Sequence, residues 1–229
     1  MKHLLLCFFL LPVCLFGQCY GSFEVFAGTG LSGTPSKFSR VDGRPVLATD
    51  FGFGASIAVG RRTLLRTSMH FGQYGDRQWT GPNGLRWGSQ HDGRGGFDPF
   101  GLGEPELEPD VINRHQFIEG TVALRRVFPL RSPLRPFLEG GLSFGKYITS
   151  VNQTEGEDPA FETIRRFRSA SPIGRLGIGA DYNFNDHVGM YAMPVVQYHL
   201  RSLNERGLTK VNPWRATLEV GVRVFVDPR

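Results

Sequence analysis

Cysteine is scarce in this chain, which limits how the fold can be cross-linked. The 229 residues include three cysteines, and Cys7 and Cys14 fall in a leading segment that we expect to be removed. The mature chain would then keep only Cys19 and could form no internal disulfide. A lipid anchor on Cys19 is the alternative, but Gln18 stands where a lipidation signal has a small residue. No disulfide framework is therefore predicted.

Long apolar runs are also missing after the first residues, so no transmembrane helix is predicted. Residues 4–16 are apolar apart from one proline, and a lysine and a histidine precede them. The run is too short to span a membrane as a helix and has the shape of a secretory signal. Gly17 supplies the small residue favoured before a cleavage site. The pattern predicts a signal peptide at residues 1–17 and one domain at residues 18–229.

Recognisable catalytic motifs are scarce as well. A Gly-x-Ser-x-Gly match occurs at residues 141–145, but it falls inside a predicted strand rather than at the strand-to-helix turn that a hydrolase nucleophile needs. The sequence contains no His-Glu-x-x-His and no phosphate-binding loop motif. The acidic run at residues 104–110 offers oxygens for calcium, but its prolines and its lack of a turn glycine favour an exposed loop. We predict no catalytic residue, no cofactor and no metal site. The formal charge of +5 is spread over the chain without a basic patch, which argues against a nucleic-acid partner.

Glycine and phenylalanine are abundant, with 30 and 19 residues. Glycine weakens helices and aromatic residues favour strands, so the composition indicates an all-β protein. The clearest strand pattern is residues 215–226, where every even-numbered position is apolar and most odd-numbered positions are polar or small. Side chains alternate between the two faces of a strand, so this segment has one apolar face and one charged face.

Eight such strands are predicted, separated by connections that alternate between long and short. The short connections would lie at one end of the sheet and the long, polar ones at the other. An even number of strands also makes the first and last strands antiparallel neighbours, which closes the sheet into an up-and-down barrel without exposed edges. The predicted strands are residues 22–30, 47–60, 64–74, 111–128, 136–149, 167–182, 187–200 and 215–226.

Alternation alone does not say which face points outward. A lipocalin-like soluble barrel would place the apolar face inside, around a small hydrophobic ligand, whereas a transmembrane barrel places it on lipid. The signal peptide, the loop asymmetry and strands long enough to cross a bilayer favour an eight-stranded transmembrane barrel. Its interfacial aromatic girdles would then come from residues near strand ends. These are Tyr74, Trp79, Tyr182, Phe184, Tyr198 and Trp214.

The inward face of this barrel carries acids and bases on neighbouring strands. Eight strands enclose a space that side chains just fill, so the charges should pair and plug the interior. An ion or proton path through the interior is one alternative. A second alternative is an enzyme that acts on lipid or peptide at the loop-side rim, where three histidines lie near strand ends: His70, His115 and His199. The predicted interior ion pairs involve Glu24, Asp50, Arg66, Glu119, Arg125, Glu139, Arg175, Asp181, Glu219 and Arg223.

The chain resembles the small eight-stranded outer-membrane proteins of the OmpA and OmpX kind, and the outer-membrane β-barrel domain common in Bacteroidetes. The most specific part is the last strand. There Glu219, Gly221, Val224 and Val226 fit the polar-x-Gly-x-x-hydrophobic-x-hydrophobic signal that the barrel-assembly machinery reads in such proteins. These proteins usually end on an aromatic residue, whereas here Phe225 is followed by Val-Asp-Pro-Arg.

The resemblance implies a protein of the cell outer membrane, in contact with outer-membrane lipid and inserted by the assembly machinery. The interpretation that follows is a non-enzymatic barrel with a structural role, or with a surface partner that binds its long extracellular loops.

Overall fold

The computed structural model of the chain describes seven stretches of residues. They are residues 21–34, 43–78, 111–128, 133–154, 158–162, 168–203 and 211–226. The predicted signal peptide, the acidic run at residues 104–110 and Trp79 lie outside them. Every helix or strand assigned within these stretches is a strand, and none of them contains a helix long and apolar enough to span a membrane.

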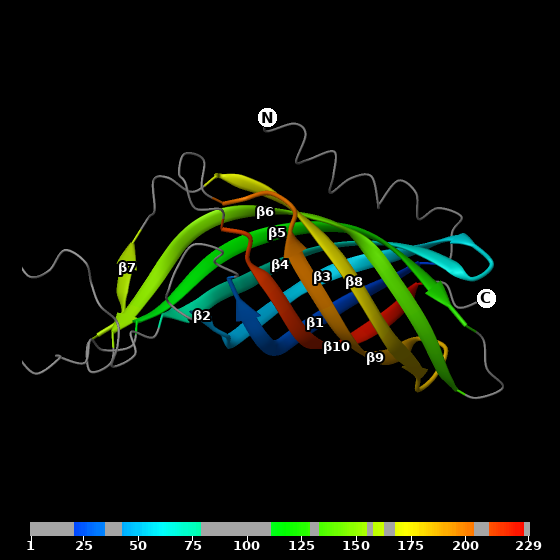
Figure 1. Ribbon diagram of the computed structural model, residues 1–229. Coiled ribbons are helices and arrows are strands. Elements are labelled where there is room, and N and C mark those ends of the chain that lie inside the picture. The colour runs from blue at the N-terminus through cyan, green and yellow to red at the C-terminus, as the bar shows by residue number, and fades with distance from the viewer. Residues whose placement is uncertain are drawn as a thin grey trace, which may run out of the picture.

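Ten strands form one antiparallel sheet, and eight of them close it into a barrel (Figure 1). Around the wall the order is β1, β3, β4, β5, β6, β8, β9 and β10, after which β10 pairs with β1. This confirms the predicted all-β, eight-stranded, up-and-down architecture. The bounds are β1 Gly21–Gly33, β2 Gly43–Arg44, β3 Val46–Gly60, β4 Thr63–Gln78, β5 Val111–Val127, β6 Leu134–Thr154, β7 Ala160–Glu162, β8 Ala170–Asn183, β9 Val188–His199 and β10 Trp214–Val226.

Closure joins the first and last strands of the described chain. They pair along the whole of β1, from Gly21 opposite Val226 to Gly33 opposite Trp214. Each barrel strand therefore has a neighbour on both sides, and the wall has no open edge. Such closure is what a strand-built structure needs in lipid, where unpaired backbone groups find no partner.

The β8–β9 turn shows how the sequence sets a short connection. The side-chain Oδ1 of Asn185 accepts hydrogen bonds from the backbone N–H groups of His187 and Val188, each at 2.8 Å. Asparagine favours turns because its side chain can replace a backbone acceptor in this way. This turn and the β3–β4 turn lie at one end of the barrel, opposite the end beside β7 (Figure 1).

The loop-side end differs from the sequence prediction. β4 continues to Gln78 and β6 to Thr154, past the predicted ends at residues 74 and 149. Two short strands extend the sheet there, β2 beside β4 and β7 beside β6. They have two and three residues, too few to show a hydrophobic period.

The two faces of the wall are chemically opposite. Outward positions are exposed and mostly apolar, such as Phe53, Val122, Leu142 and Val222, whereas most charged residues of the same strands point inward and are buried. Arg126 and Lys146 are exceptions and are exposed. The division between the faces matches the predicted parity on the seven strands for which faces were predicted, all but residues 187–200, and is the reverse of a soluble barrel. Among the aromatic residues assigned to girdles, Tyr182, Phe184 and Tyr198 are exposed. Tyr74 is buried inside the barrel, so its assignment to a girdle was wrong.

Candidate functional site

The charged interior is the most distinctive site of the barrel. The ten residues predicted to pair there all point inward, and none is more than 5 % exposed. Strand parity places them there, since each alternates along its strand with apolar residues on the outer wall. Their salt bridges fall into two networks, one nearer the short turns and one nearer the loops, and no salt bridge seen among the described residues joins the two.

Arg66 of β4 is the centre of the turn-side network. Its Nη1 donates to Oε1 of Glu139 at 2.9 Å and its Nη2 to Oε1 of Glu219 at 2.8 Å, while its Nε donates to Glu24. The carboxylates come from β6, β10 and β1, so this one guanidinium links distant parts of the wall. Tyr191 of β9 joins the same group, because its hydroxyl accepts from Arg66 Nη2 at 2.8 Å and donates to Glu219 at 2.7 Å.

Arg125 and Arg175 complete the coordination of these carboxylates. Arg125 Nη2 lies 2.7 Å from Oε2 of Glu139, and Arg175 Nε donates to the other oxygen of Glu139 at 3.1 Å. Arg175 Nη2 also donates to Glu219 at 2.6 Å. Glu139 thus receives charge-assisted hydrogen bonds from three arginines, which offset the cost of burying its charge.

Arg223 and Asp181 close the turn-side network. Arg223 lies 3.0 Å from Asp181 Oδ1 and 3.3 Å from Glu24 Oε2, and Arg125 lies 3.5 Å from the same Asp181 oxygen. In all, four carboxylates face four guanidiniums: Glu24, Glu139, Asp181 and Glu219 against Arg66, Arg125, Arg175 and Arg223. The formal charges of this network cancel.

Aromatic rings fill the space around these guanidiniums. Arg125 lies 4.0 Å from the ring centre of Phe137 and 4.7 Å from that of Tyr191, and Arg66 lies 4.8 Å from that of Phe26. Arginine stacks favourably on aromatic faces when both are removed from water. Phe26, Phe137 and Tyr191 form one buried cluster with Met193 and Val195, so the turn-side half is packed with side chains.

The loop-side network is built on Arg215 of β10. Its Nη2 lies 3.5 Å from both Asp50 Oδ2 and Glu119 Oε1, and its Nε donates to Gln197 Oε1 at 2.9 Å. His70 Nε2 lies 2.9 Å from the other oxygen of Glu119. Here two carboxylates face one guanidinium and a histidine. Arg215 was omitted from the predicted set, although it lies on the same odd-numbered face as Glu219 and Arg223.

A buried apolar and aromatic cluster lies beyond this network, toward the loop-side end of the barrel. We call it the loop-side cap; it comprises Tyr74, Phe117, Tyr147, Ile173 and Leu203. Leu203 follows β9, is fully buried, and is held by backbone bonds: its N–H donates to Val211 at 2.8 Å, and its carbonyl accepts from Arg168 at 2.7 Å. The chain leaving β9 therefore turns over the barrel mouth.

The loop-side histidines contact serines. His115 Nδ1 lies 2.8 Å from Ser150 Oγ, and His199 Nδ1 lies 3.1 Å from Ser171 Oγ. Both serines are fully buried, so neither oxygen is presented to a substrate in solvent. Within the described residues, no group of three or more histidine, cysteine, aspartate or glutamate side chains could hold a metal ion.

The proposed assembly-signal residues divide between the two faces of β10. Glu219 and Gly221 point into the barrel, and Val224 and Val226 point outward. Val224 lies opposite Phe23 of β1, at the closing seam. The signal residues therefore belong to the strand that completes the barrel.

An apolar exterior around a charged, ion-paired interior defines the transmembrane class of β-barrel rather than the lipocalin class. No protein-family model and no curated protein matches the chain.

Solved structures that align with the chain include outer-membrane proteins. A major outer membrane protein from Thermus thermophilus aligns with 90% of this chain and 99% of its own, at 12% identity and a TM-score of 0.51. Neisserial surface protein A aligns with 88% of this chain and 96% of its own, at 15% identity and a TM-score of 0.48. At 12% identity the likeness to the Thermus protein concerns the fold alone, which is that of an outer-membrane β-barrel.

Proposed function

We propose that this protein is a non-enzymatic, integral outer-membrane barrel with an ion-paired, closed interior and a surface-interaction role at its loop-side end. One observation carries the proposal: a closed wall with apolar side chains outward surrounds carboxylates and guanidiniums that pair with each other. Lipid on the outside and mutual pairing on the inside satisfy both sets of groups.

The packed interior supports a barrel without a stable aqueous channel. Arg66, Arg125 and Arg215 are fully buried, together with Tyr74, Tyr191 and other large side chains. Eight strands leave an interior that side chains of this size fill. The buried Ser–His contacts also favour a non-enzymatic role, because a rim enzyme would need its nucleophile open to substrate.

Two segments of the sequence support a proposal for export and insertion. We propose that residues 1–17 are cleaved on export, and that Glu219, Gly221, Val224 and Val226 are read by the barrel-assembly machinery. Outer-membrane lipid would then cover the outward face of β10 and its neighbours.

The loop-side extension is the part proposed to contact a surface partner. β6 has 21 residues. At about 3.3 Å per residue and a tilt of about 40°, such a strand rises roughly 50 Å, about twice the apolar band of roughly 25 Å. β7 pairs with β6 in this upper part, where Phe161 lies opposite Val151 and is 73% exposed. Phe161 therefore offers an exposed aromatic side chain on the part of the sheet that extends past the apolar band.

Conductance tests the closed interior. The purified protein in planar lipid bilayers should show no large, stable open state. Steady currents of the size given by a 16-stranded porin would refute the closed interior, even if the protein fractionates with the outer membrane and shows heat-dependent gel mobility.

Surface labelling tests the orientation. In Phe161→Cys, a membrane-impermeant maleimide should label whole cells, whereas Asp186→Cys in the β8–β9 turn should react only after lysis. The unmodified protein controls for Cys19. Equal labelling of both variants on intact cells would contradict the proposed orientation.

A further inference from the structure

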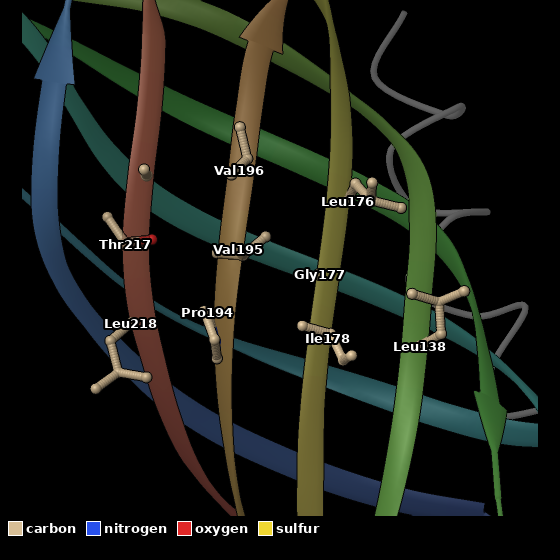
Figure 2. A pocket seen from close by; sticks show the side chains of 10 residues that line it. Leu138, Leu176, Gly177, Ile178, Pro194, Val195, Val196, Thr217 and Leu218 are labelled. Carbon is tan, nitrogen blue, oxygen red and sulfur yellow. The ribbon is translucent and has the colours of Figure 1, made fainter.

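The outer wall carries an apolar groove of about 540 Å³ (Figure 2). It crosses four adjacent strands, β6, β8, β9 and β10. Its side chains include Leu138, Leu176, Ile178, Pro194 and Leu218, with the small Ala216 beside them. A groove needs small or indented positions among large ones, and Ala216 and Pro194 supply them.

Pro194 also interrupts the wall beneath the groove. Between β8 and β9 the paired residues run from Ile173 with His199 to Gly177 with Val195 and resume at Ala180 with Ala192. The residue opposite Pro194 in this register is Ile178, and that pair is missing. Proline has no N–H to donate to a ladder, which is why it is rare in central strands.

The missing donor is on the β8 side of Pro194. The Pro194 carbonyl lies 3.2 Å from where a Cβ of Gly177 would stand, so it points toward β8. In an antiparallel strand the N–H and the carbonyl of one residue face the same neighbour. The carbonyl of Ile178 therefore has a proline ring opposite it instead of a backbone donor. The groove lies over a locally weakened seam in the wall.

The chemistry of the groove restricts what can cover it. Its outward side chains carry no charge and no hydrogen-bonding group, since Thr217 in its lining points into the barrel. A lipid headgroup or a charged peptide would find no partner there. The strands that form the groove also carry other apolar, exposed residues on their outward faces, such as Leu142 on β6 and Val220 on β10. The groove therefore lies within the apolar belt of the wall that faces lipid.

We propose that this groove binds one acyl chain of an outer-membrane lipid and holds it longer than the rest of the belt does. The proposal rests on the membrane location given under Proposed function. A chain seated there packs against Leu176, Ile178 and Leu218 and fills the depression at Pro194, so that apolar surface is buried over the weakened β8–β9 seam.

Retention of lipid after extraction tests the site. The protein is reconstituted into vesicles of phosphatidylethanolamine and phosphatidylglycerol, re-extracted in a mild detergent, and examined by native mass spectrometry. The unmodified protein should retain one phospholipid. Ala216→Phe, which places a ring in the groove, should reduce the retained fraction several-fold.

Ala27→Phe is the matched control, because Ala27 is outward and exposed on β1, outside the groove. It should retain lipid like the unmodified protein. Equal lipid retention by the two phenylalanine variants would overturn the proposal. A dimer without bound lipid that Ala216→Phe abolishes would also overturn it, because the occupant of the groove would then be a second copy of the chain. Heat-dependent gel mobility of each variant reports barrel formation separately, so loss of the groove's lipid is distinguishable from failure of the membrane barrel.

Discussion

Arg66 on β4 and Glu139 on β6 are hydrogen-bonded over 2.9 Å although β5 lies between their strands in the wall. The contact spans the interior rather than following the sheet. Arg66 simultaneously reaches Glu24 and Glu219, so a single side chain ties three other strands together.

Replacing Arg66 should therefore be the most damaging interior change. Arg66→Met leaves three buried carboxylates short of a partner, and we expect a cost of about 3–5 kcal/mol in the free energy of unfolding, typical of breaking a buried ion pair. Urea unfolding in phospholipid vesicles, followed by gel mobility, measures this. Arg61→Ala, in the exposed β3–β4 turn, should leave the unfolding midpoint nearly unchanged. Similar midpoints for the two variants would mean that the network does not stabilise the barrel.

A charge on the outer wall should impair insertion. Val222 faces outward on β10 between Val25 and Met190. Val222→Arg should cost about 2–4 kcal/mol if it lies near the middle of the bilayer, whereas Val222→Leu keeps the face apolar and should insert normally. The fraction of heat-modifiable protein in the outer membrane is the measurement. Normal insertion of the arginine variant would mean that this face does not contact lipid.

Gly221 has a steric role that strand parity does not reveal. Parity alone predicts a mild effect for Gly221→Ser, because the position faces a polar interior. However, a Cβ there would lie 2.5 Å from Cε1 of Tyr191, whose hydroxyl is held by Arg66 and Glu219. We now expect Gly221→Ala to cost about 1–3 kcal/mol through overpacking.

Gly120→Ala is its matched control, since nothing lies within 4 Å of a Cβ at that outward position. It should be tolerated in the same unfolding assay. Equal stability of both alanine variants would show that the Tyr191 ring moves aside without cost.

The loop-side cap should contribute measurable stability. Leu203 is fully buried in it, whereas Leu200, three residues earlier, is 56% exposed. Leu203→Ala should cost about 2–5 kcal/mol, as expected for a truncated core leucine, and Leu200→Ala much less. Unfolding midpoints in vesicles compare them. An equal, small effect would mean that Leu203 does not pack in the barrel mouth.

Alternation of residue type was enough to predict the barrel. In the segment 215–226 the two faces differ strongly in polarity. A shift of this strand by one residue would turn Glu219 and Arg223 toward the lipid. Parity therefore determined which side chains point inward, and Arg215 could have been included on the same grounds.

Which inward residues meet was not predictable. Arg66 and Glu139 are brought together by the stagger of the strands around the barrel, which depends on the register of every pairing at once. The same holds for Gly221 beside Tyr191. The inward position of Tyr74 could have been predicted, because Tyr74 shares the parity of Arg66 and His70 on the same strand. β2 and β7 have no sequence period of their own and exist only because β4 and β6 offer them edges.

The separation of the interior charges into two networks has an energetic consequence. Arg66 and Arg215 share no salt-bridge partner among the described residues. Changes at sites without shared partners usually add, whereas members of one network couple. The cost of the double variant Arg66→Met, Arg215→Met should thus equal the sum of the single costs, while Arg66→Met with Arg175→Met should deviate from additivity. The interior would then hold two separately paired sets of charges inside one continuous wall, with Phe26, which packs against both Arg66 and His70, as the contact between them.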